Sequence, residues 1–146
     1  MSAGHPGSRR VLVVCLGNHC RSPLGAAALA RHGPPGTEVR SAGLAAKHQG
    51  RPAHPAMIQA AATLGYDLAG HLGAQVTDQM LDWADLVLAM DSAVLEQLRT
   101  LTAGAARPEL RLYAEGRDVP DPWGKDAAAF ADCARLIEEA ARQQRQ

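Results

Sequence analysis

The stretch VLVVCLGNHCRSP (Val11–Pro23) joins an apolar run, a short loop and the start of a helix. Its first part, Val11–Cys15, is continuously apolar and mostly β-branched, which is typical of a strand buried on both faces. Ser22 is suited to cap the helix that follows, and Pro23 to occupy its first position. A strand, a loop and a helix start in this order turn backbone N–H groups and a helix dipole toward one point. The stretch therefore predicts an anion-binding loop.

Two side chains of this loop carry chemistry. Cys15 ends the strand, where positive potential favours the thiolate, the nucleophilic form of cysteine. Arg21 follows in the same loop, and its planar guanidinium matches two oxygens of a phosphoryl group. A cysteine that ends a buried strand is usually a small core residue. The prediction of a nucleophile therefore depends on Arg21, Ser22 and the Asp121-Pro122 pair being present in the same chain.

Strands and helices alternate through the rest of the sequence. Further strands are expected at Glu38–Ser41, Asp85–Met90 and Leu110–Tyr113. Helices are expected from Pro23 to Arg31 and at about 55–64, 92–100 and 126–142, the last with Cys133 on its buried stripe. This alternation predicts an α/β fold: a single three-layer domain with a central four-stranded parallel sheet flanked by helices.

The expected topology brings distant residues together. Ligands of open parallel sheets bind beyond the carboxyl ends of the strands. Cys15, Asp91 and Asp121 each follow one of the predicted strands. We therefore expect these three side chains to gather at one edge of the sheet.

Composition limits the class of protein. With 146 residues, of which 47% are hydrophobic, the chain can form one domain, expected over 11–146 after a disordered leader over 1–10. Lysine plus arginine equals aspartate plus glutamate at 15 each, which offers no electrostatic attraction for nucleic acid. No apolar segment is long enough to span a membrane. We expect a monomer or weak dimer.

Cysteine and histidine usage indicates the compartment and argues against a metal. Three cysteines do not form the framework of a small secreted disulfide protein, so a reducing cytoplasm is the expected location. Cys15, His19 and Cys20 lack the second Cys/His pair of a usual tetrahedral site. Neither a metal nor an organic cofactor is expected.

The signature Cys-x5-Arg-Ser, formed here by Cys15, Arg21 and Ser22, resembles that of the low-molecular-weight protein tyrosine phosphatases. The similarity extends over about 11–141. It includes Ser41-Ala42-Gly43, Gly65-Tyr66-Asp67-Leu68, His71, Gln75, Ala84–Asp91 and Val119-Pro120-Asp121-Pro122-Trp123-Gly124. The resemblance implies the Rossmann-like fold of phosphotyrosine protein phosphatase I and the hydrolysis of phosphotyrosine-type monoesters, with inorganic phosphate as product and inhibitor.

The family's mechanism gives the matching residues their expected roles. Cys15 attacks phosphorus and forms a phosphocysteine. Asp121 protonates the departing oxygen and then activates water. Arg21 and the loop N–H groups bind the phosphate. The expected phosphate-binding residues are Leu16, Gly17, Asn18, His19, Cys20, Arg21 and Ser22.

A second set of residues supports this loop by similarity. Ser22 can donate a hydrogen bond to the Cys15 sulfur. Asn18 is expected to hold the loop through a polar network that includes Ser41, His71 and Asp91.

Each supporting residue also has a plainer structural interpretation. Cys20 either packs in the loop or forms a reversible disulfide with Cys15 that protects the nucleophile from oxidation. His71 can be a core histidine, and Asp91 a helix N-cap. Asp121 can be a turn residue, as Asp before proline often is.

The rim of the predicted pocket departs from the family. Lys47 stands where relatives often have an aromatic residue, and Trp123 is followed by Gly124 instead of a second aromatic. His19 replaces an apolar residue or a threonine. We therefore take Lys47 and Trp123 as the substrate rim and leave two alternatives open: a protein-arginine phosphatase, or a phosphate-binding module with little turnover. An arsenate reductase is disfavoured because the middle third of the chain has no further cysteine.

Overall fold

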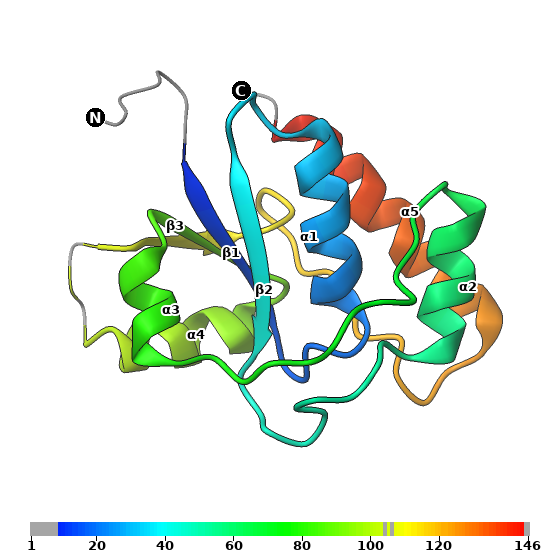
Figure 1. Ribbon diagram of the computed structural model, residues 1–146, viewed down its shortest axis with the longest axis horizontal. Helices are drawn as coiled ribbons and strands as arrows, with labels where there is room; N and C mark the ends of the chain where they lie inside the picture. The colour runs from blue at the N-terminus through cyan, green and yellow to red at the C-terminus, as the bar shows by residue number, and fades with distance from the viewer. Residues whose placement is uncertain (1–8, 104, 106, 145–146) are drawn as a thin grey trace.

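The computed structural model describes residues 9–103, 105 and 107–144. In these residues a central sheet is covered by helices on both faces (Figure 1). The strands are β1 (Arg10–Cys15), β2 (Glu38–Gly43), β3 (Leu86–Ala89) and β4 (Glu109–Leu112). The helices are α1 (Arg21–His32), α2 (Pro55–Thr63), α3 (Asp78–Trp83), α4 (Ser92–Leu101) and α5 (Ala127–Gln143).

The sheet confirms the predicted topology. Within the described residues four strands pair in the order β2-β1-β3-β4, and every pairing is parallel. The central strands β1 and β3 are the two most apolar runs of the sequence and lie buried, as their composition predicts. All four strands therefore end at one edge, where the loops after β1, β3 and β4 meet.

Alternating side chains of β1 and β3 divide the core into two clusters. Val11, Val13 and Leu88 pack against α1, α2 and α5 on one face of the sheet (Figure 1). Leu12 and Val14 pack against α3 and α4 on the other face. Every one of these five side chains is at most 2% exposed, so the central strands are fixed from both sides and give the loops at their ends a rigid base.

Helix α1 lies close against the sheet because it carries Gly25 at the contact. A Cβ atom added there would come within 2.3 Å of the Met90 side chain. The Gly25 carbonyl accepts a hydrogen bond from the Tyr113 hydroxyl at 2.8 Å, which joins α1 to the segment after β4. The start of α1, which carries part of the predicted site, is held by these contacts.

The beginning of α1 differs from the prediction. The helix starts at Arg21, and its N-cap is Cys20, whose side chain makes no capping hydrogen bond. Ser22 is therefore not the cap, and Pro23 is not the first helical residue. The Ser22 hydroxyl is engaged with Asn18 and the Cys15 sulfur instead.

Other differences are small. Helix α3 was not expected, and the ends of the strands differ from prediction by one or two residues. Residues 1–8 of the predicted leader lie outside the described residues, and Arg10 already belongs to β1. Among the described helices none is both long and apolar enough to cross a bilayer.

Candidate active site

The loop between β1 and α1 is shaped by the backbone of Asn18. This residue has φ of +53°, in the left-handed region that costs an L-residue about 1 kcal/mol. Gly43, at the end of β2, allows the loop to come close, because a Cβ atom there would lie 2.6 Å from the Asn18 nitrogen. The turn at Asn18 aims its own N–H group at the Cys15 sulfur, 3.2 Å away.

The Asn18 side chain is fully used to hold this conformation. Its Nδ2 donates to Ser22 Oγ at 2.8 Å and to Ser41 Oγ at 3.0 Å. The side-chain Oδ1 accepts from the Ala74 N–H at 2.9 Å. The backbone carbonyl oxygen of Asn18 accepts from His71 Nε2, also at 2.9 Å. Buried hydrogen bonds contribute about 1 kcal/mol each, so together they exceed the cost of the backbone strain. Asn18, Ser22, Ser41 and His71 are therefore brought together as the sequence predicts.

The Cys15 sulfur receives its contacts from this same network. Besides the Asn18 N–H, it is hydrogen-bonded to Ser22 Oγ at 3.0 Å. Because Ser22 Oγ accepts from Asn18, its own proton can be donated to the sulfur at 3.0 Å or to the Ala42 carbonyl at 3.5 Å, and the sulfur is the nearer acceptor. Two hydrogen-bonding groups, the Asn18 N–H and the Ser22 hydroxyl, are therefore directed at this one sulfur.

Arg21 lies beside Cys15 and is held by one edge of its guanidinium. Nη1 donates to Asp91 Oδ2 at 2.7 Å and to the Val119 carbonyl at 2.8 Å. The side chain is only 3% exposed. Burial alone would lower the pKa of Arg21, but the hydrogen bond to Asp91 and the charges of Cys15 and Asp121 outweigh it and raise the pKa above its usual value. Arg21 is therefore a permanent, oriented cation.

Asp91 joins the network through Arg21 and also caps a helix. It does not bond Asn18; one carboxylate oxygen binds Arg21, and the other accepts from the Val94 N–H at 2.9 Å and so caps α4. The helix-capping interpretation of Asp91 is thus confirmed, and its link to the loop runs through Arg21.

Asp121 lies across from Arg21 in the loop between β4 and α5. Its Oδ2 is 3.7 Å from Arg21 Nη2, and its Oδ1 accepts from the Trp123 N–H at 3.0 Å, a turn typical of aspartate. The side chain is 41% exposed. Asp118, three residues earlier, accepts from the Ser92 N–H and hydroxyl and fastens the loop to α4. The carboxyl of Asp121 is thus both aimed and open to solvent.

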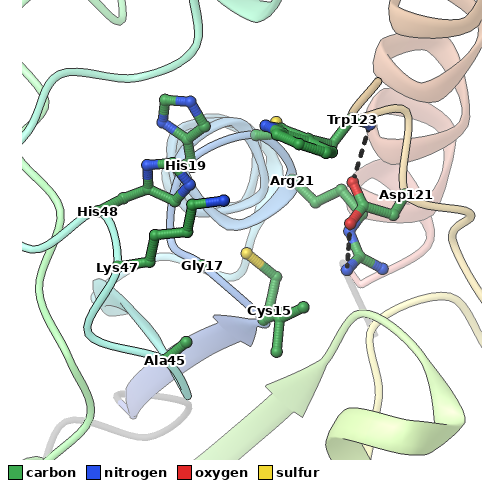
Figure 2. A pocket seen from close by; sticks show the side chains of 11 residues that line it. Cys15, Gly17, His19, Arg21, Ala45, Lys47, His48, Asp121 and Trp123 are labelled. Atoms are coloured by element: carbon green, nitrogen blue, oxygen red, sulfur yellow. Dashed lines mark hydrogen bonds and ion pairs between the residues drawn. The ribbon is translucent and has the colours of Figure 1, made fainter. Parts of the chain in front are cut away.

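These side chains surround one pocket of about 220 Å³ (Figure 2). Its lining residues are Cys15, Leu16, Gly17, His19, Cys20, Arg21, Ala45, Lys47, His48, Asp121 and Trp123. The two predicted rim residues meet at its mouth, where Lys47 Nζ lies 4.9 Å from the centre of the Trp123 ring.

Sequence reasoning missed Ala45 and His48 as lining residues. His48 stacks on His19 with ring centres 3.8 Å apart. Nothing in the sequence pairs two histidines 29 positions apart, because the contact arises only when the loop after β2 folds over the loop after β1.

The other two cysteines are neutral thiols. Burial raises the pKa of Cys20 and that of Cys133 to about 12, and all three cysteines are free. Cys133 is buried in the core, as expected. The reversible disulfide between Cys15 and Cys20 remains a prediction. Within the described part of the chain, no group of three His, Cys, Asp or Glu side chains is placed to hold a metal ion.

Comparison with known proteins shows to which family the chain belongs. The family model described as "Low molecular weight phosphotyrosine protein phosphatase" matches residues 10–146. The chain belongs to this family. The probable low molecular weight protein-tyrosine-phosphatase EpsP of Ralstonia nicotianae is 37% identical to it over 131 residues, which is 89% of either chain. The resemblance expected from the Cys-x5-Arg-Ser signature is thus confirmed.

Two solved structures share the fold of this chain. Vibrio vulnificus Wzb, in complex with benzylphosphonate, is similar with a TM-score of 0.86 and 33% identity, covering 94% of this chain and 97% of its own. The YwlE arginine phosphatase of Geobacillus stearothermophilus is similar with a TM-score of 0.82 and 30% identity, covering 93% and 90%. The proteins to which this chain is similar are therefore named for two kinds of phosphorylated side chain, tyrosine and arginine.

Proposed function

We propose that this protein is a phosphatase that hydrolyses phosphotyrosine-type monoesters through a phosphocysteine intermediate. The observation that carries the proposal is the meeting of Cys15, Arg21 and Asp121 around one pocket. A nucleophile, a fixed cation and an exposed carboxyl are the three groups that phosphoryl transfer without a metal requires.

In the first step the Cys15 thiolate attacks phosphorus in line with the ester oxygen. The S–P bond forms as the P–O bond to the leaving group breaks, and Asp121 gives its proton to that oxygen. Arg21 and the loop N–H groups hold the three equatorial oxygens during transfer. The fixed orientation of Arg21 supports this role, since its guanidinium needs no rearrangement as charge moves.

In the second step water cleaves the phosphocysteine. Asp121, now a carboxylate, takes a proton from the water as its oxygen bonds to phosphorus. The S–P bond breaks, and the sulfur leaves as a thiolate that the Asn18 N–H and the Ser22 hydroxyl stabilise. Inorganic phosphate is released, and the site returns to its starting state without a cofactor.

The pocket mouth favours an aryl ester over a phosphoarginine. The Lys47 ammonium group lies at the entrance, beside Trp123. Its positive charge repels a guanidinium group but not a phenyl ring. The indole of Trp123 offers a flat face to such a ring. The alternative, an arginine phosphatase, draws its support from the similarity to YwlE.

Rates on two phosphopeptides of otherwise equal sequence test the function and separate these substrates. We expect kcat/KM for the phosphotyrosine peptide to exceed that for the phosphoarginine peptide by at least about tenfold, which is 1.4 kcal/mol of transition-state binding. The opposite order would establish the arginine phosphatase. Tight phosphate binding without turnover of either peptide would instead indicate a binding module.

The proposal also covers the substrate class, the location and the oligomeric state of the protein. The substrate is a phosphorylated protein or a small phosphomonoester, and inorganic phosphate is both product and inhibitor. We place the enzyme in the cytoplasm, where a thiolate nucleophile stays reduced, and infer that it works as a monomer or weak dimer without a nucleic-acid partner.

A further inference from the structure

Two histidine rings form one wall of the pocket. His19, from the loop after β1, and His48, from the loop after β2, lie face to face with ring centres 3.8 Å apart and planes 5° from parallel. Figure 2 shows both rings on the side of the pocket away from Trp123 and Asp121. Aromatic rings therefore line the pocket on two opposite sides (Figure 2).

The His19 ring is held by the surrounding backbone, and the His48 ring is held by stacking on it. The Pro52 carbonyl can only accept, so His19 Nδ1, 3.2 Å away, carries the proton and donates it. The His19 carbonyl accepts from the His54 N–H at 2.9 Å, and the His54 ring meets His19 edge-on at 5.2 Å. Gly17 makes room for His48, since a Cβ atom on it would lie 3.1 Å from His48 Cδ2. The wall is thus formed before any ligand enters.

The pair is an uncharged surface near neutral pH. Burial, followed by the nearby His48 and His54, lowers the pKa of His19. Burial, followed by the charges of Lys47 and Arg51, lowers the pKa of His48. Neutral imidazole faces stack with other aromatic rings and do not attract anions as a cation would.

We infer that the stacked pair of His19 and His48 is the wall on which the aromatic ring of an aryl phosphate lies, and that His48 is a specificity-determining residue for ring-bearing substrates. The inference rests on the proposed function, because it says which residues of the same pocket contact the leaving group of the substrate. Cys15 and Arg21 take the phosphoryl group, whereas His48 lines the same pocket without a hydrogen bond or ion pair to either of them.

Binding of two phosphonates by calorimetry tests this assignment without turnover. Benzylphosphonate carries the ring and methylphosphonate does not, so the ratio of their dissociation constants measures the contribution of the ring. Variants His48→Ala and His48→Phe remove and restore a flat surface. Gln49→Ala is the matched control, since Gln49 is the next residue, is exposed and does not line the pocket.

We expect His48→Ala to reduce the preference for benzylphosphonate by about three- to tenfold, the range for losing one aromatic contact. His48→Phe and Gln49→Ala should keep the preference within about twofold of the original protein.

An unchanged preference in His48→Ala would overturn the inference. Equal weakening of both phosphonates, or failure of His48→Phe to restore the preference, would contradict it too, because His48 would then act on the loop and not on the ring. Failure of the proposed function has a different signature: absence of turnover by the unaltered protein, whatever the phosphonates show.

Discussion

Asp121 has its two carboxylate oxygens in different surroundings. Oδ1 is fixed by the Trp123 N–H, while Oδ2 faces Arg21 at 3.7 Å. A carboxyl that is held on one side and open on the other can pass a proton across the pocket mouth without losing its orientation. In the proposed mechanism the basicity of the leaving group determines how strongly the reaction rate depends on this proton.

Asp121→Ala should therefore slow esters with poor leaving groups most. For phenyl phosphate we expect kcat to fall by about 10²-fold or more, the usual contribution of a general acid. For nitrophenyl phosphate, whose anion leaves readily, the fall should be several times smaller in single-turnover measurements of the first step. Asp121→Asn keeps the shape of the side chain but cannot transfer the proton, so it should behave like the alanine variant. Equal losses on both esters would remove Asp121 from the acid role.

At the scale of single residues, the sequence predicts chemistry better than contacts. The loop spacing selects Cys15 and Arg21 only in combination with the Asp121-Pro122 pair later in the chain, since the spacing alone is a weak signal. Ser22 is wrongly predicted as a helix cap, because a cap is judged from local sequence and its hydroxyl is engaged by tertiary contacts. The cap formed by Asp91 is predicted correctly, but its contact with Arg21 is not specified by the sequence. His48 is missed for the same reason: its neighbour on the pocket wall is remote in the sequence.

Helix α1 connects the pocket to a second cluster of charges at its other end. There Glu138 of α5 accepts hydrogen bonds from the Tyr66 hydroxyl at 2.5 Å, from His32 at 3.0 Å and from Arg142 at 3.3 Å. Burial favours the neutral acid, but these bonds outweigh it and lower the pKa of Glu138 below its usual value. The cluster ties α1 to α5 and to the loop after α2.

The lowered pKa of Glu138 makes this tie dependent on pH. Because the carboxylate form is favoured in the folded state, its stabilisation is present above the unfolded pKa of about 4.3 and is lost as pH falls through the lower folded value. Glu138→Gln should lower the free energy of unfolding at pH 7 by about 1 kcal/mol, with the difference shrinking below about pH 4.

Urea unfolding at several pH values measures this effect. Glu139→Gln is the matched control, because its neighbouring carboxylate is exposed and its hydrogen bond to Gln143 is long at 3.5 Å. A difference for Glu138→Gln that stays constant from pH 7 to pH 3 would contradict the account.

At the scale of elements, hydrophobic pattern is a reliable predictor only for the longer segments. β1 and β3 are recognised because at least four apolar residues follow one another in each, and α5 because its apolar residues recur at helical spacing. Helix α3 has six residues and a single buried one, Leu81, so it has no periodicity to detect. Its local signals are Thr77, which caps it through the Met80 N–H, and the acidic Asp78 in its first turn.

At the scale of the whole molecule, the parallel order β2-β1-β3-β4 does most to build the site. It places the loops after β1, β3 and β4 at one edge, so that residues as distant in sequence as Cys15 and Asp121 line one pocket. This convergence is predictable, because parallel sheets bind ligands at that edge. The distances within the pocket cannot be predicted from the sequence, since they depend on how two loops pack against each other.

The formation of a phosphocysteine on Cys15 is the central claim, and mass spectrometry of the acid-quenched enzyme tests it most directly. During turnover of an aryl phosphate, the account predicts one phosphoryl group on the peptide that contains Cys15. Cys15→Ser should carry no such group and show no turnover, while still binding inorganic phosphate through Arg21 and the loop N–H groups. Phosphoryl transfer to another residue, or ordinary turnover by Cys15→Ser, would contradict the account.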